Sequence, residues 1–106
     1  MTILKGTLDI LVLKALAWEP MHGFEIIAWL EQRSSGSLDV DDGALYYALH
    51  RMEERGLIES EWRLTSNNRR ARYYRLREAG VEHLRTEGAN LERYARALTD
   101  ILAVGA

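Results

Sequence analysis

The chain has 106 residues, of which 47% are hydrophobic and 28% are charged, as is ordinary for one small globular domain. It contains no cysteine, which excludes disulfide bonds and cysteine-based zinc sites. The three histidines are in separate segments without the spacing of a metal site, and no apolar run reaches the ~18 residues that a membrane-spanning helix needs. We therefore expect a cytoplasmic protein that holds no metal and no cofactor.

The formal net charge of −2 by itself argues against a nucleic-acid partner, but the basic residues are concentrated in one stretch. From Arg63 to Arg77 there are six arginines and no acidic residue. Because phosphate binding depends on the local field and not on the average charge, the composition remains compatible with DNA binding.

The first apolar segment, residues 3–18, predicts a helix that is apolar on nearly every side. It has neither a basic leader nor a small-residue cleavage site, which favours a core helix over a signal peptide. Such a helix must be covered on more than one side, which in so short a chain indicates a partner chain.

Residues 19–23, with the sequence EPMHG, contain a proline and a glycine, and because both residue types interrupt helices they predict a break. Residues 24–33 then predict a second helix, which we expect to bury Phe24, Ile27 and Leu30.

The central stretch, residues 41–58 with the sequence DDGALYYALHRMEERGLI, predicts a third helix. Aspartates at its start are typical N-cap residues, and Gly56 is typical of the position just past a helix end. One face is apolar: Leu45, Ala48, Leu49 and Met52. The opposite face is polar and aromatic: Gly43, Tyr46, Tyr47, His50, Arg51 and Glu54. This helix suits the major groove of DNA, and the alternative is an ordinary core helix whose outer face is hydrated.

Two stretches with alternating apolar and polar residues follow, 58–64 and 71–76. The polar run between them, TSNNRR, favours a turn because asparagine tolerates positive φ. Three helices and a hairpin in this order are typical of a winged helix-turn-helix, with the arginine-rich hairpin as the wing.

Residues 78–103 predict a long final helix with an a/d seam across three heptads. The seam consists of Val81, Leu84, Gly88, Leu91, Ala95, Leu98 and Leu102. So long a helix cannot bury its whole seam within this chain, so we expect a homodimer. The predicted interface residues are Leu84, Gly88, Leu91, Ala95, Leu98 and Leu102. The alternative is a helix that packs only on its own domain.

The sequence thus predicts a mainly α fold with a small β-hairpin, in two parts. Residues 1–77 would form a winged helix-turn-helix DNA-binding domain, and residues 78–106 a C-terminal dimerisation helix.

Several segments resemble the PadR-type transcriptional regulators, over nearly the whole chain. They are LVL at 11–13, PMHGFEI at 20–26, GALYYALHRMEERGLI at 43–58 and the hairpin RRARYYRLREAG at 69–80. The single final helix is similar to the shorter branch of that family, which dimerises through it. The resemblance implies a dimeric repressor, relieved in some members by an aromatic or drug-like ligand near the dimer interface.

Three positions depart from the pattern of that family. Ala44 stands where threonine or serine is usual, Tyr47 where proline is frequent, and Arg77 where threonine is common. Ala44 lacks a hydroxyl that would contact phosphate, Tyr47 adds a bulky group near the groove, and Arg77 lengthens the arginine patch. These changes leave the DNA-binding class intact and affect which operator sequence is bound.

The candidate DNA contacts fall into two groups. The helix would read bases through Gly43, Tyr46, Tyr47, His50 and Arg51, and the wing would contact phosphates through Arg69, Arg70 and Arg72. Each of these arginines could instead belong to a solvated face. Arg63 and Arg75 lie on strands, where pairing with Glu59 or Glu61 is the alternative. A two-fold dimer predicts a pseudo-palindromic double-stranded operator with half-sites about 34 Å apart.

Two other classes of function are alternatives to a DNA-binding regulator. The net acidity favours a dimeric winged-helix adaptor that binds protein and not DNA. An enzyme has little support, because no carboxylate pair, catalytic triad or glycine-rich phosphate loop occurs with usable spacing. Trp18, Trp29 and Tyr94 could line an effector pocket, but aromatic residues at such positions more often pack the core.

Overall fold

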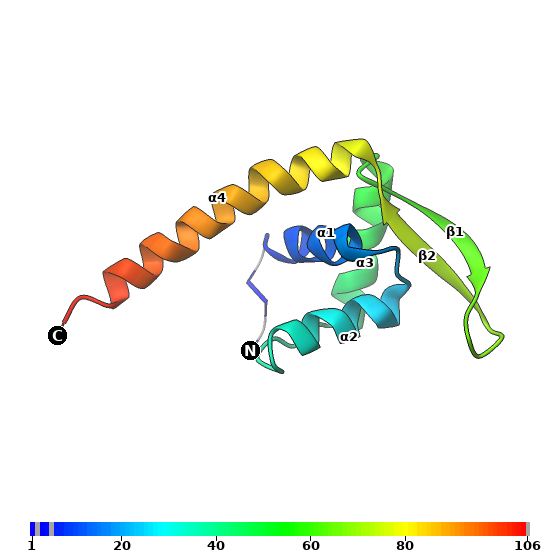
Figure 1. The fold of residues 1–106 in the computed structure, drawn as a ribbon, viewed down its shortest axis with the longest axis horizontal. Helices are drawn as coiled ribbons and strands as arrows, with labels where there is room; N and C mark the ends of the chain where they lie inside the picture. The colour runs from blue at the N-terminus through cyan, green and yellow to red at the C-terminus, as the bar shows by residue number, and fades with distance from the viewer. Residues whose placement is uncertain (2, 5, 106) are drawn as a thin grey trace.

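The computed structural model describes residues 1, 3–4 and 6–105, and it has the predicted fold class (Figure 1). The elements are α1 (Leu8–Trp18), α2 (Gly23–Arg33), α3 (Asp42–Glu54), β1 (Ile58–Leu64), β2 (Arg70–Leu76) and α4 (Glu78–Leu102). The first three helices enclose the core, the two strands form a hairpin beside them, and α4 extends away from both.

The first helix starts later than predicted, at Leu8 and not at residue 3. Gly6 has a φ of +90°, a left-handed conformation that a continuous helix excludes, and the Thr7 amide closes a turn by donating to the carbonyl of Leu4. Residue 5 of the predicted helix lies outside the described residues. The helix that remains is covered on several sides, with Val12, Leu13, Ala15 and Leu16 buried.

The second helix begins with a capping box. His22 Nδ1 accepts a hydrogen bond from the Glu25 amide at 3.3 Å, and the Glu25 carboxylate accepts one from the His22 amide at 3.1 Å. The predicted buried face was partly wrong, because Phe24 is 71% exposed and Ile26 is fully buried in its place. Phe24 stands about 200° around the helix from Ile26, so burying one exposes the other. Leu30 is buried as predicted.

The third helix matches its prediction closely. The Asp41 carboxylate caps it by accepting a hydrogen bond from the Ala44 amide at 2.8 Å, and Gly56 follows its end with a φ of +75°. The predicted apolar face is buried: Leu45, Ala48, Leu49 and Met52. α3 therefore contributes one side to the core and leaves the other to solvent.

The hairpin is a two-stranded antiparallel sheet whose register pairs Ile58 with Leu76 and Leu64 with Arg70. Since partners across an antiparallel pair point to the same side, the register divides the hairpin into two faces. We call them the inner and the outer wing face. The inner wing face carries Ile58, Ser60, Trp62, Leu64, Arg70, Arg72, Tyr74 and Leu76. The outer wing face carries Glu59, Glu61, Arg63, Ala71, Tyr73 and Arg75. Ile58 and Tyr74 are buried, so the inner wing face continues outward from the core.

The last helix leaves the domain where its backbone lies against the turn after α3. A Cβ on Gly80 would lie 2.1 Å from the Leu57 carbonyl oxygen, so only glycine fits there without a shift. The helix has 25 residues, about 37 Å at 1.5 Å per residue, and its outer half extends past the other helices (Figure 1). Within the described ranges, no helix is long and apolar enough to span a membrane.

Candidate nucleic-acid interface

The outer face of α3 is open to solvent where the sequence predicted it. Gly43 and His50 are exposed, Tyr46 is 45% exposed and Tyr47 is 66% exposed. His50 Nε2 lies 3.1 Å from the Glu54 carboxylate on the next turn. This face thus presents aromatic rings and hydrogen-bonding groups on a rigid helix.

Tyr46 also serves in packing, because its ring tip lies against the start of α2. A Cβ on Gly23 would be 2.3 Å from the Tyr46 hydroxyl oxygen, so the glycine makes room for the tyrosine. This contact fixes the position of α3 relative to the N-terminus of α2, and it agrees with the prediction that Tyr46 sits at the edge of the buried face.

Arg51 is held within the protein. Its Nη2 donates to both oxygens of Asp9 on α1 at 2.5 Å, and its guanidinium lies 5.1 Å from the centre of the Tyr47 ring. The hydrogen bond with Asp9 raises the pKa of Arg51, and partial desolvation opposes the rise. Arg51 therefore ties α3 to α1, and reaching a base would require it to leave Asp9. Its role as a base-reading residue stays a prediction.

The arginines of the hairpin divide between the two wing faces. On the outer face, Arg63 Nε is 2.8 Å from Glu61 and Arg75 Nε is 2.8 Å from Glu59, which confirms the alternative that these two pair with acids. On the inner face, Arg72 donates to the Ser60 hydroxyl at 2.7 Å and lies 3.6 Å from Glu53.

Arg69 and Arg70 make no ion pair within the part of the chain that the structure describes. Both are exposed at the tip of the wing. Their charges are therefore available to an anionic partner.

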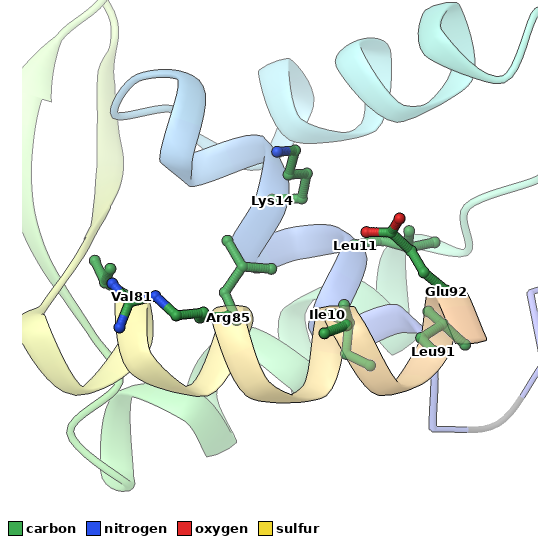
Figure 2. A pocket seen from close by; sticks show the side chains of 10 residues that line it. Ile10, Leu11, Lys14, Val81, Arg85, Leu91 and Glu92 are labelled. Carbon is green, nitrogen blue, oxygen red and sulfur yellow. The ribbon is translucent and has the colours of Figure 1, made fainter. Parts of the chain in front are cut away.

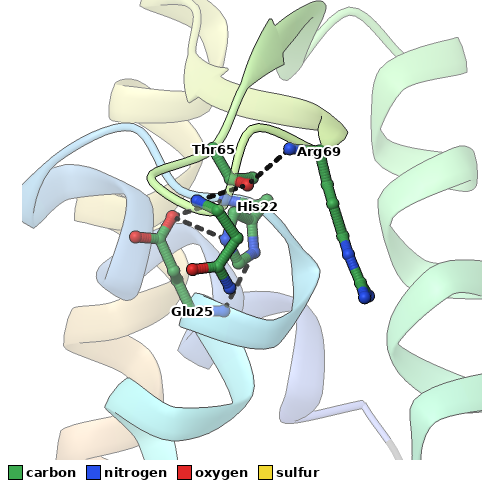
Figure 3. A network of polar contacts seen from close by, with 5 residues as sticks. His22, Glu25, Thr65 and Arg69 are labelled. Carbon is green, nitrogen blue, oxygen red and sulfur yellow. Dashed lines mark hydrogen bonds and ion pairs between the residues drawn. The ribbon is translucent and has the colours of Figure 1, made fainter.

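A cleft of about 660 Å³ separates the wing from the start of α2. Its lining residues include His22, Gly23, Phe24, Tyr46, Trp62, Arg69, Arg70, Arg72 and Tyr74. Figure 3 shows two sets of hydrogen bonds beside this cleft. One is the capping box of His22 and Glu25, and the other is the turn in which Thr65 Oγ1 accepts a hydrogen bond from the Arg69 amide at 3.3 Å. The Arg69 side chain points away from that turn. Burial raises the pKa of the Tyr74 hydroxyl at the base of the cleft. The cleft combines cationic, aromatic and helix N-terminal groups.

A second groove, of about 480 Å³, lies between α1 and α4 (Figure 2). Ile10, Leu11 and Lys14 of α1 face Val81 and Leu91 of α4 across it. Of the predicted dimer residues, Leu84, Gly88 and Leu91 are half-buried, whereas Ala95, Leu98 and Leu102 are exposed. The first half of the seam thus packs partly on its own domain, and the second half is left without a cover inside the described chain.

Of the aromatic residues considered for an effector pocket, Trp18 and Trp29 lie near each other, and Tyr94 is on a different helix. Arg33 lies 5.4 Å from the centre of the Trp18 ring and 5.1 Å from that of Trp29, so the cation holds these two together. Tyr94 is 62% exposed on α4. Their part in ligand binding stays a prediction.

Comparison with known proteins decides the family. A model described as the transcriptional regulator PadR-like family matches residues 12–86, which include most of α1, all of α2 and α3, and the whole wing. The chain belongs to the PadR-like family of transcriptional regulators. The similarity noted in the helix and wing sequences is thereby confirmed.

Individual PadR-like relatives agree with this assignment. The transcriptional regulator Rv3488 of Mycobacterium tuberculosis is 38% identical over 86 residues, which are 80% of this chain and 76% of that protein. The crystal structure of a PadR family transcriptional regulator from Eggerthella lenta is similar with a TM-score of 0.76 and 28% identity, covering 95% of this chain and 86% of that one. Bacillus subtilis PadR in complex with operator DNA has a TM-score of 0.67 and 16% identity, covering 76% and 46% of the two chains. At that identity the likeness shows the fold alone.

Two features of the PadR-like interface were missed by sequence reasoning. Asp9 was not singled out, because it is 42 residues from Arg51 and nothing in the local pattern of α1 indicates a partner on α3. Trp62 was treated only as a strand position. The alternation that places it beside Arg72 was visible, and it could have indicated that both share one face.

Proposed function

We propose that this PadR-like protein is a homodimeric repressor that binds a pseudo-palindromic double-stranded operator. The outer face of α3 would enter the major groove, and the wing would follow the phosphate backbone beside it. The proposed DNA contacts are Gly43, Tyr46, Tyr47, His50, Arg51, Arg69, Arg70 and Arg72. In this proposal residues 1–77 bind DNA, residues 78–106 join the two copies, and the protein works in the cytoplasm, where an operator is accessible.

One observation carries the proposal: the acids of the hairpin pair with Arg63 and Arg75 on the outer wing face, while Arg69 and Arg70 at the tip have no such partner in the described chain. Arg69 and Arg70 line the same cleft as Tyr46 of α3. A polyanion could therefore contact helix and wing together. Bacillus subtilis PadR, with a similar fold, has been determined in complex with operator DNA.

Dimerisation is proposed to cover the exposed end of the α4 seam. Leu98 is 40% exposed and Leu102 is 82% exposed, although both lie on the face that continues from the half-buried Leu91. Burying apolar surface contributes roughly 25 cal/mol per Å², so this seam favours a second copy. The α1–α4 groove is where an aromatic effector would act on such a dimer, because its lining is mainly apolar.

The decisive experiment for DNA binding is a titration of a random-sequence duplex at rising salt. A DNA-binding regulator gives a steep linear fall of log affinity with log salt. A slope near zero would leave the second candidate, a dimeric winged-helix adaptor that binds protein, which the net charge of −2 favours. Selection of bound fragments from the source genome would then define the operator, and a reporter placed behind it would show whether the protein represses.

A further inference from the structure

The end of the wing carries two exposed apolar side chains that the core does not use. Trp62 is 57% exposed and Leu64 is 64% exposed, and both lie on the inner wing face of β1. Two large apolar groups on a thin hairpin far from the core contribute little to folding. They are better explained by a partner surface.

Two cations hold the indole of Trp62. The guanidinium of Arg70 lies 5.3 Å from the centre of the Trp62 ring, and that of Arg72 lies 5.8 Å from it. Both distances are within the range of a cation–π interaction. Two positive charges therefore lie close to the ring.

The positive charge around the Trp62 ring indicates an anionic partner. The carboxylates of β1, Glu59 and Glu61, point to the opposite face of the hairpin. Within the described chain, Glu53 of α3 is the acid that contacts the inner wing face. Its carboxylate lies 3.6 Å from Arg72 and accepts a hydrogen bond from the Ser60 hydroxyl. An apolar ring flanked by cations fits a surface in which negative charges border apolar groups, as phosphates border deoxyribose in a DNA groove.

We propose that Trp62 is a DNA contact, packing its ring against the deoxyribose wall of the minor groove while Arg70 and Arg72 meet the phosphates on either side. This proposal rests on the proposed function. Trp62 lines the same cleft as Tyr46 of α3, so one duplex can meet both. Arginine is favoured in narrow minor grooves by their negative potential, and apolar side chains enter them as wedges.

The first test is a fluorescence titration that isolates Trp62. The chain has three tryptophans, so the double variant Trp18→Phe with Trp29→Phe leaves Trp62 as the only one. Adding a random-sequence duplex should change its emission, saturating at the affinity measured from the anisotropy of a labelled duplex. An unchanged emission while the duplex binds would overturn the proposal and leave the proposed function intact. An equal change with polyglutamate would also overturn it, because charge alone would then explain the signal.

The second test separates a ring contact from a charge contact. Trp62→Ala should weaken duplex binding about tenfold, the scale of losing one aromatic contact to a nucleic acid, with an unchanged salt slope. Arg70→Ala should instead flatten the slope by about 0.9 per protomer, and Trp62→Phe should restore most of the affinity. The matched control is Trp18→Ala, which removes an indole of comparable exposure, 66% against 57%, outside the cleft. Equal affinity of the Trp62→Ala variant and the unmodified protein would refute the contact, whereas no binding by the unmodified protein would refute the proposed function.

Discussion

The salt dependence of DNA binding gives the sharpest test of the wing. Replacing Arg69 and Arg70 together with alanine removes two charges that have no acidic partner in the described chain. Each phosphate neutralised contributes ~0.9 to the slope of log affinity against log salt, so the change is ~1.8 per protomer and ~3.6 for a dimer. From 50 to 200 mM salt, a fourfold rise, the unmodified dimer should therefore lose ~150-fold more affinity than the variant.

The control for this prediction lies on the same hairpin. Replacing Arg63 and Arg75 with alanine removes the same number of charges, but these arginines are paired with Glu61 and Glu59 at 2.8 Å. Fluorescence anisotropy of a labelled duplex across the salt series would measure both slopes. The control slope should match that of the unmodified protein. If both double variants flatten the slope equally, net charge governs binding and the division of the wing into two faces has no functional meaning.

Three further predictions concern stability and assembly. Gly80→Ala places a Cβ 2.1 Å from the Leu57 carbonyl oxygen. Because the better helix propensity of alanine offsets part of this clash, the variant should lower the free energy of unfolding by ~1–2 kcal/mol, measured by urea denaturation. Asp41→Ala removes the cap of α3 and should cost ~1 kcal/mol in the same assay, and an unchanged midpoint would show that the cap is dispensable. Leu91→Glu with Leu98→Glu should give monomers by sedimentation velocity, and a persisting dimer would contradict the role proposed for the seam.

The order of the helices and the hairpin could be predicted because each element carries its own local signal. Capping by Asp41, termination at Gly56 and the alternation from residue 58 are properties of short stretches. The two errors arose where local signals competed. In α2 both Phe24 and Ile26 could have been buried, and only the packing of the whole domain decides between them. At the N-terminus, apolar residues continued the helical pattern past Gly6, whose backbone conformation ends it.

The candidate site was predictable to the extent that it follows from helix and strand periodicity. The exposed face of α3 follows from the burial of its other face, and the pairing of Arg63 and Arg75 follows from strand alternation. The link between Asp9 and Arg51 does not follow from either, because it joins two helices whose relative orientation depends on the complete core. Sequence reasoning identifies which residues are exposed, whereas the structure identifies which of them are already bound within the protein.

The same distinction explains how a chain with a net charge of −2 can present a surface for DNA. The acids are used locally: Glu59 and Glu61 neutralise arginines on the outer wing face, and Asp9 holds Arg51. The two pairs on the outer wing face lower the positive charge of that face, and they leave the wing tip positive. Since the screening length is only about 10 Å at 0.1 M salt, a phosphate at the tip responds mainly to the nearest charges. In the proposed complex, Glu59 and Glu61 would therefore direct DNA to the inner side of the hairpin and would not prevent its binding.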